Sequence, residues 1–257
     1  FSTGTPWLTG RRGEVVFTAA LFALAVILGL AVYSDYGVGW DEENNATYGA
    51  ITLDHVLGRN QDAFHYRDPG DFWHPVTGQF ARTHGPAYEL LLVAVERAAG
   101  LQDSPAGIEL RHLCVFFTLV AGAFFFHLFC RRAFGSWKLG LLGALVFLLH
   151  PRIFAHGFHN SMDIGFLAAF TLCMHTLLRA LRRPTFWRGC VHGAACGLLV
   201  DIRIAGMIMP ALSVLFLALE VAAAPGRLER LRQAGRSLGG AALLFFPVVV
   251  LLWPMLW

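Results

Sequence analysis

Seven long apolar runs separated by clusters of arginine are the feature of this sequence that most constrains its fold. The runs are 15–33, 109–130, 139–149, 164–178, 189–200, 204–223 and 238–257. A helix needs about 20 apolar residues to cross a bilayer, and several of these runs reach that length. Only 14% of the 257 residues are charged, against roughly 25% in a soluble domain. The sequence therefore predicts an all-α, polytopic membrane protein of about seven transmembrane helices. It excludes a disordered chain, a coiled coil and an ordinary soluble enzyme.

The basic residues between the runs predict how the helices are oriented. Four clusters hold 13 of the 20 basic residues. They are Arg11 and Arg12; Arg131, Arg132 and Lys138; Arg179, Arg182, Arg183 and Arg188; and Arg227, Arg230, Arg232 and Arg236. Cytoplasmic loops carry an excess of lysine and arginine, so all four clusters are expected in the cytoplasm together with the N-terminus. Fourteen of the 17 acidic residues then fall on the outer side.

This orientation requires that the shorter apolar segment 86–99 does not cross the membrane. With 14 residues it is about six residues short of a span. Gly85-Pro86 is a favourable helix start, and Glu89, Glu96 and Arg97 fall on one helical face. These features predict an amphipathic helix in the membrane interface.

The resulting topology treats residues 1–257 as one transmembrane module, expected to be the N-terminal part of a longer protein. A first helix at 15–33 precedes a periplasmic loop at 34–108 that holds the interfacial helix. Helices two to seven follow within 109–257. Their expected ranges are 109–130, 137–155, 164–180, 189–205, 207–223 and 238–257.

The outer loop opens with three consecutive carboxylates, Asp41, Glu42 and Glu43, beside Trp40. They form either a solvated loop or a site at the membrane surface. Paired carboxylates can serve as a general base with an orienting partner, or can bind a metal ion.

The segment from His150 to Asp163 is unusually polar for a connection between two spans. It contains His150, Arg152, His156, His159, Asn160 and Asp163. A plain polar turn is one interpretation, and Asp163 is also suited to an N-cap. His156 and His159 have an HxxH spacing that zinc sites use, although this spacing alone does not identify zinc.

Asp201 and Arg203 are charged residues in the predicted fifth helix, in the outer half of the bilayer. Charges at such depth are costly and are usually functional or paired. Two residues apart, they point in different directions, so each is expected to have a partner elsewhere. A buried ion pair of Asp201 with Arg152 is the structural alternative. Three polar stretches thus converge at one depth, which favours a site for a lipid with an anionic head, because arginine suits phosphate.

Several of these motifs together resemble the membrane glycosyltransferases of the GT-C fold. The matching segments are Asp41-Glu42, Thr83-His84-Gly85-Pro86-Ala87-Tyr88, Arg111 with Arg131-Arg132, His150 to His156 with Asn160 to Asp163, and Gly193 to Arg203. The segment from His150 to Asp163 is similar to bacterial proteins related to the dolichyl-phosphate-mannose protein mannosyltransferases (family 39). The resemblance covers most of residues 15–210.

The resemblance implies an inverting transfer of a sugar from a polyprenyl-phosphate donor on the periplasmic side. Asp41 maps to the catalytic base or acceptor-orienting group, assisted by Glu42, and Asp163 maps to the second acidic position. An arginine near the lipid phosphate would be Arg203 or Arg152. The remaining substrate-binding candidates are His84, His156, His159, Asn160 and Asp201.

Two other functions compete with a glycosyltransferase. One is a non-catalytic scaffold subunit of a larger membrane complex, whose small-residue face of Gly189, Gly193 and Gly197 would pack against partner helices. The other is a transporter, although no inverted repeat is visible. The expected partners are the lipid-linked donor, membrane lipids and, for a scaffold, other proteins, but no nucleic acid. No cofactor or obligatory metal ion is expected, and the bacterial inner membrane is the expected location.

Overall fold

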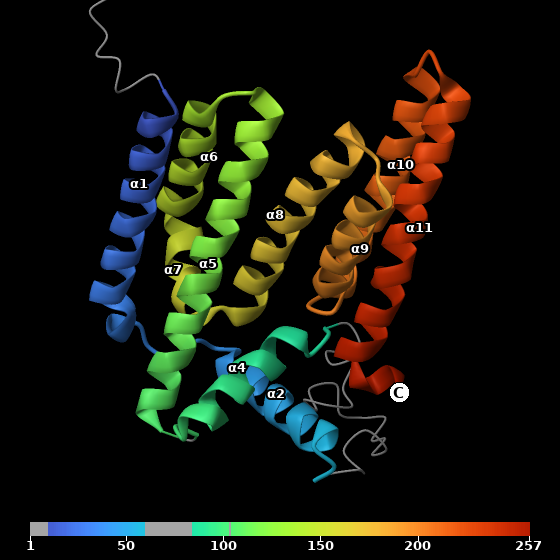
Figure 1. Cartoon of the computed structure of the whole chain (residues 1–257). Coiled ribbons are helices and arrows are strands. Elements are labelled where there is room, and N and C mark those ends of the chain that lie inside the picture. Colours follow the sequence, from blue (N-terminus) through green and yellow to red (C-terminus); the bar gives the residue numbers. More distant parts are fainter. Residues whose placement is uncertain (1–9, 60–83, 103) are drawn as a thin grey trace, which may run out of the picture.

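The computed structural model describes residues 10–59, 84–102 and 104–257, and the regular elements in these ranges are helices (Figure 1). The α-helices are α1 (Arg11–Val32), α2 (Glu42–Val56), α4 (Ala87–Ala99), α5 (Pro105–Phe134), α6 (Trp137–Leu149), α7 (Pro151–His159), α8 (Ser161–Arg182), α9 (Phe186–Val200), α10 (Ile208–Ala223) and α11 (Arg227–Leu252). Short 3-10 helices are η2 (Tyr33–Asp35), η3 (Ile204–Met207) and η4 (Pro254–Leu256). The predicted all-α class is confirmed for this part of the chain.

Five helical segments of the described chain are long and apolar enough to cross a membrane. They are Arg12–Asp35, α5, α8, Ile204–Ala223 and α11. The bent pair of α6 and α7 brings the number to as many as six. The chain is therefore a multi-pass membrane protein. The remaining predicted span, the fifth helix at 189–205, corresponds to α9, which has only 15 residues, so the count of seven stays a prediction.

Neighbouring long helices run in opposite directions, so that their ends gather at two faces of the bundle (Figure 1). One face, the arginine-rich end, contains the start of α1, the ends of α5 and α8, and the turn between α10 and α11. The predicted clustering of basic residues on one side is confirmed for these helices. At the opposite, acidic end, α2 and α4 lie across the bundle.

Helices α9 and α11 pack closely because glycines line their contact. A Cβ atom at Gly189 would lie 1.9 Å from the backbone oxygen of Ser237, and one at Gly193 would lie 2.0 Å from that of Ala241. Small residues allow such backbone approach in membranes. The glycine face that a scaffold subunit would present to a partner is therefore covered by α11 of the same chain.

Several predicted helix boundaries were wrong. The seventh helix, expected from residue 238, begins at Arg227 as α11. The third helix does not run straight through 137–155: it ends at Leu149, and α7 continues at a bend of 65°. The bend lies at Pro151, whose ring prevents a continuous helix. The fifth helix ends at Val200 instead of 205, and the second begins at Pro105, where Ser104 caps it by accepting a hydrogen bond from the Gly107 amide at 3.1 Å.

A stack of aromatic rings anchors α7 beside α5. The Phe158 ring lies between Phe116 of α5, at a centroid distance of 5.0 Å, and Tyr36, at 4.2 Å. Phe116 and Phe158 are fully buried. This stack fixes the connection from α7 to α8 next to the segment that follows α1, and both segments carry candidate site residues.

Candidate functional site

The acidic segment after α1 is the beginning of a helix, α2, and not an open loop as predicted. Asp41 occupies the N-cap position, and Glu42 and Glu43 lie in the first turn, where negative charge is favourable. Glu42 is 5% exposed. Its carboxylate accepts a hydrogen bond from the Gly39 amide at 2.9 Å and lies 3.2 Å from Nε2 of His112 in α5. Glu42 thus ties the turn to the bundle.

The neighbours of Glu42 face outward. Asp41 and Glu43 are exposed, and Trp40 is 95% exposed. The two carboxylates on either side of Glu42 are therefore accessible from the surroundings at the acidic end. An exposed tryptophan beside them is typical of a membrane–water interface.

The connection from α7 to α8 is ordered by Asn160. The Asn160 side chain accepts a hydrogen bond from the Asp163 amide at 3.0 Å and so caps α8. Its amide nitrogen also donates to the Asp163 carboxylate at 2.8 Å and lies 2.7 Å from Nδ1 of His156. The N-cap is therefore Asn160 and not Asp163, which lies three residues later in the first turn.

Asp163 forms an ion pair with Arg203, with 2.7 Å between the carboxylate and Nη2. The side chains are 49% and 32% exposed, so the pair remains open to the surroundings. Arg203 reaches Asp163 because α9 has ended and the backbone at Arg203 is extended. The prediction that Asp201 and Arg203 lie within the fifth helix was wrong, since the chain leaves the helix at Asp201.

Asp201 itself is completely buried, and its carboxylate oxygens have no hydrogen-bond partner among the described residues. The turn before α4 lies directly on its backbone: a Cβ atom at Gly85 would be 2.0 Å from the Asp201 oxygen. Arg152 is exposed on α7, and no Asp201–Arg152 ion pair forms. The structural alternative for these two residues was therefore wrong.

Two groups of predicted residues lie next to each other, one in the turn before α2 and one in the connection from α7 to α8. Gly39, beside Asp41 and Glu42, packs on His159, because a Cβ atom at Gly39 would lie 3.1 Å from its ring. The rings of His156 and His159 are 5.4 Å apart. Thus the α2 turn and the α7–α8 connection are neighbours at the acidic end. His84 contributes its backbone oxygen, which accepts a hydrogen bond from Tyr48 of α2 at 3.0 Å.

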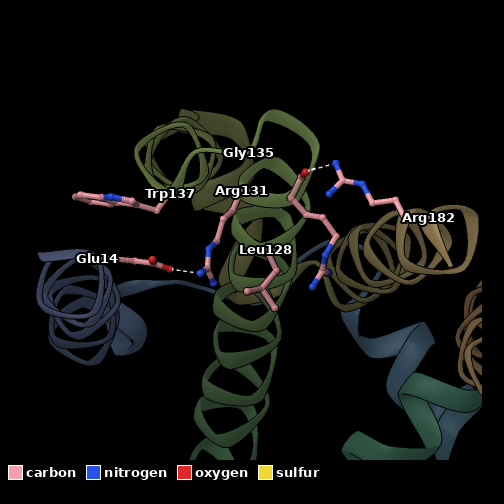
Figure 2. Close-up of a pocket in the computed structure, with 7 residues that line it drawn as sticks. Glu14, Leu128, Arg131, Gly135, Trp137 and Arg182 are labelled. Carbon is pink, nitrogen blue, oxygen red and sulfur yellow. Dashed lines mark hydrogen bonds and ion pairs between the residues drawn. The ribbon is translucent and has the colours of Figure 1, made fainter. Parts of the chain in front are cut away.

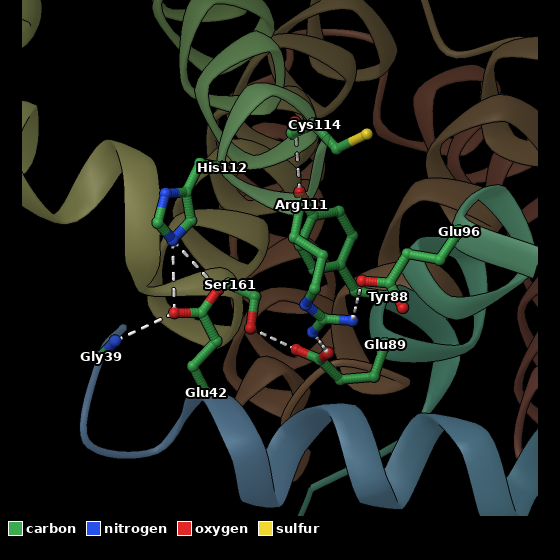
Figure 3. Close-up of polar contacts among 9 residues, drawn as sticks. All are labelled: Gly39, Glu42, Tyr88, Glu89, Glu96, Arg111, His112, Cys114 and Ser161. Atoms are coloured by element: carbon green, nitrogen blue, oxygen red, sulfur yellow. Dashed lines mark hydrogen bonds and ion pairs between the residues drawn. The ribbon is translucent and has the colours of Figure 1, made fainter. Parts of the chain in front are cut away.

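A second network of buried charges was missed by the sequence analysis (Figure 3). Arg111 of α5 lies 2.5 Å from Glu89 and 3.4 Å from Glu96, both in α4, and Ser161 of α8 donates a hydrogen bond to Glu89. Arg111 and Glu89 are 3% and 1% exposed. The network connects three helices, and its lack of exposure indicates a structural role.

This network also corrects the expected orientation of α4. The predicted amphipathic helix is present, but the face with Glu89 and Glu96 turns toward α5 and not toward water. Tyr88, beside Glu89, is buried as well and donates a hydrogen bond to Thr118 of α5 at 2.8 Å. Burial raises the pKa of Glu96, while Arg111 opposes that increase. One sequence feature could have indicated this network: Arg111 lies near the start of an apolar run, where an unpaired charge is costly.

Comparison with protein-family models, with curated proteins and with solved structures found no significant match. Within the described ranges, no group of three or more histidine, cysteine, aspartate or glutamate side chains is arranged to hold a metal ion.

Proposed function

We propose that this protein is a glycosyltransferase that moves a sugar from a polyprenyl-phosphate donor to a hydroxyl group of a lipid, glycan or protein. The observation that carries the proposal is the half-exposed Asp163–Arg203 pair. Asp163 lies four residues after His159, which packs on Gly39 in the turn before Asp41. Arg203 would provide a cation for the phosphate, and Asp41 would provide an accessible carboxylate for the hydroxyl group. The resemblance to GT-C glycosyltransferases supports the same assignment, with the site on the periplasmic side of a bacterial inner membrane.

In the proposed reaction, the acceptor hydroxyl attacks the anomeric carbon from the side opposite the phosphate. The new glycosidic C–O bond forms as the C–O bond to the phosphate breaks, and the electron pair leaves with the phosphate. Asp41 takes the proton of the hydroxyl group, which is the role of a general base. Arg203 stabilises the negative charge that develops on the departing phosphate.

The structure favours Arg203 over Arg152 as the residue that binds phosphate. Asp163 holds Arg203 through an ion pair, and the Arg203 side chain is 32% exposed, so part of its guanidinium is accessible to a ligand. A guanidinium can bind phosphate through two parallel hydrogen bonds. In this proposal, Asp163 holds Arg203 in place, and Glu42 holds the turn that carries Asp41.

The adjacent carboxylates of α2 offer a matched experiment. Purified protein is incubated with polyprenyl-phosphate sugars from a lipid extract, and release of polyprenyl phosphate is followed by mass spectrometry. Asp41→Asn is expected to lower the rate by about 10²–10⁴-fold, the usual contribution of a general base. Glu43→Gln removes the same charge from a neighbouring exposed position and should retain the rate. Equal rates for the two variants would contradict the role of Asp41, and no release by folded wild-type protein would contradict the proposed function.

A further inference from the structure

The arginine-rich end contains a cleft that the proposed glycosyltransferase reaction does not use. Its volume is about 390 Å³. It lies between α1, α5, the start of α6 and the end of α8 (Figure 2). The lining residues are Glu14, Leu128, Arg131, Arg132, Gly135, Trp137 and Arg182.

The charges of this cleft do not balance. Three arginines line it with a single carboxylate, Glu14, which pairs with Arg131 at 2.7 Å. Arg182 donates a hydrogen bond to the backbone oxygen of Arg132, at the carboxyl end of α5. The guanidinium of Arg132 contacts the His175 ring at 3.2 Å and no carboxylate among the described residues.

Other arginines add to the positive charge around Arg132. Arg179 and Arg188 are close enough to repel it electrostatically. Arg188 lies near the backbone oxygen of Arg179, at 3.1 Å, so it caps a helix end and does not neutralise charge. The cleft therefore favours an anion.

The rim of the cleft is suited to the membrane surface. Trp137 stacks on Phe17 of α1 at a centroid distance of 6.1 Å, and the Lys138 ammonium lies 5.9 Å from the Trp137 ring. Phe17 and Phe134 are exposed apolar residues beside it. Tryptophan and lysine are typical of the interface, where an anionic head lies above apolar chains.

We infer that this cleft binds the phosphate of an anionic phospholipid, with its acyl chains against the apolar surface of α1 and α6. Arg132 and Arg182 would donate hydrogen bonds to the phosphate oxygens, because a planar guanidinium fits phosphate geometry. The inference does not depend on the proposed function, since the cleft lies at the end of the bundle opposite the Asp163–Arg203 pair.

The test measures binding of phosphatidylglycerol to detergent-purified full-length protein, by thermal unfolding and by native mass spectrometry. Arg132→Gln is expected to weaken binding by about tenfold or more, the effect of losing one charged hydrogen bond. Arg232→Gln, which removes an exposed arginine at the same end but outside the cleft, should bind as the wild type does. Equal weakening in both variants would overturn the inference, because it would indicate general charge attraction.

Two further arms identify the source of the phosphate and control for folding. Phosphatidylcholine at the same concentration should bind more weakly, because its head has no net charge. If inorganic phosphate stabilises the protein as much as phosphatidylglycerol does, a lipid site is wrong. Arg132→Lys keeps the charge and removes the planar fork, so it should fold and still bind more weakly than the wild type. Wild-type binding by Arg132→Lys would contradict recognition by the guanidinium.

Discussion

Two ion pairs, one at each end of the bundle, differ in how deeply they are buried. At the acidic end, Glu89 and Arg111 are paired in the interior and are 1% and 3% exposed. At the arginine-rich end, the pair of Arg131 with Glu14 has an arginine side chain that is 47% exposed. The first pair is buried among three helices, whereas the second lies partly at the surface.

This difference separates charge that holds the fold from charge that is available to a ligand. Removing one partner from a buried pair leaves the other charge without compensation, which costs roughly 3–5 kcal/mol. Breaking an exposed pair costs about 1 kcal/mol or less. Position in the bundle and burial therefore have to be tested separately.

The largest effect is expected for Glu89→Gln. This variant removes the carboxylate closest to Arg111 and leaves only Glu96, at 3.4 Å, to balance it. We expect a loss of roughly 3–5 kcal/mol in the free energy of unfolding, measured by denaturation of the purified protein in detergent. Glu43→Gln makes the same chemical change at an exposed position of the same end and should alter stability little. A loss no larger than that of Glu43→Gln would show that the buried network does not hold the fold.

The contact between α9 and α11 tests whether close packing without charge contributes as much to stability as the buried charges do. A Cβ atom at Gly240 would lie 2.2 Å from the backbone oxygen of Phe186, whereas one at Gly239 would meet no atom within 4 Å. Gly240→Ala is therefore expected to destabilise the protein by about 1–3 kcal/mol, the usual cost of overpacking.

Gly239→Ala is the matched control, because alanine is the better helix former at an open position. It should unfold at the wild-type temperature or above it. If both variants unfold at the same temperature, the two helices are free to move apart, and the contact is not tight.

The smallest effect is expected for a partly exposed pair at the acidic end. Arg97 donates a hydrogen bond to Asp54 at 2.5 Å, and this contact lowers the pKa of the Asp54 carboxyl. Asp54→Asn should cost about 0.2–1 kcal/mol at neutral pH, the range of ion pairs near the surface. A loss as large as that of Glu89→Gln would mean that location, and not burial, decides the cost.

The pH dependence follows from the direction of this pKa shift. Because the folded pKa is below the ordinary value of 3.8, the pair contributes its full stability above that value. The contribution is lost as the pH falls through the folded pKa. The difference in stability between wild type and Asp54→Asn should therefore be constant near neutral pH and should shrink below about pH 4. Denaturation curves at several pH values would measure it.

Much of the fold could be predicted because the bilayer imposes a simple pattern. Apolar length indicated the long helices, and the arginine clusters placed the ends of α5 and α8 at the same end as the start of α1. The helix at 86–99 was predicted within one residue of α4, since Gly85-Pro86 marks its start. These features depend on residues that are close in the sequence.

The parts that could not be predicted depend on contacts between distant residues. Glu42 lies 70 residues from His112, and Ser161 lies 72 residues from Glu89. No local pattern indicates such pairs, because the packing of α2, α4, α5 and α8 creates them. Helix α2 was missed because it lacks an apolar run, although Asp41 and Glu42 are typical of a helix start. For Asp163 and Arg203 the sequence indicated a shared depth, but not that they form a pair.

The glycine face of α9 also has a consequence for biosynthesis. Helix α9 is synthesised before α11, and α10 lies between them in the sequence. Until α11 has been synthesised, the face with Gly189 and Gly193 has no partner to cover its backbone. With 15 residues, α9 is also short for a stable position in the bilayer by itself. Its final place is therefore set late, when α11 inserts beside it, so the order of insertion along the chain differs from the order in which the helices settle.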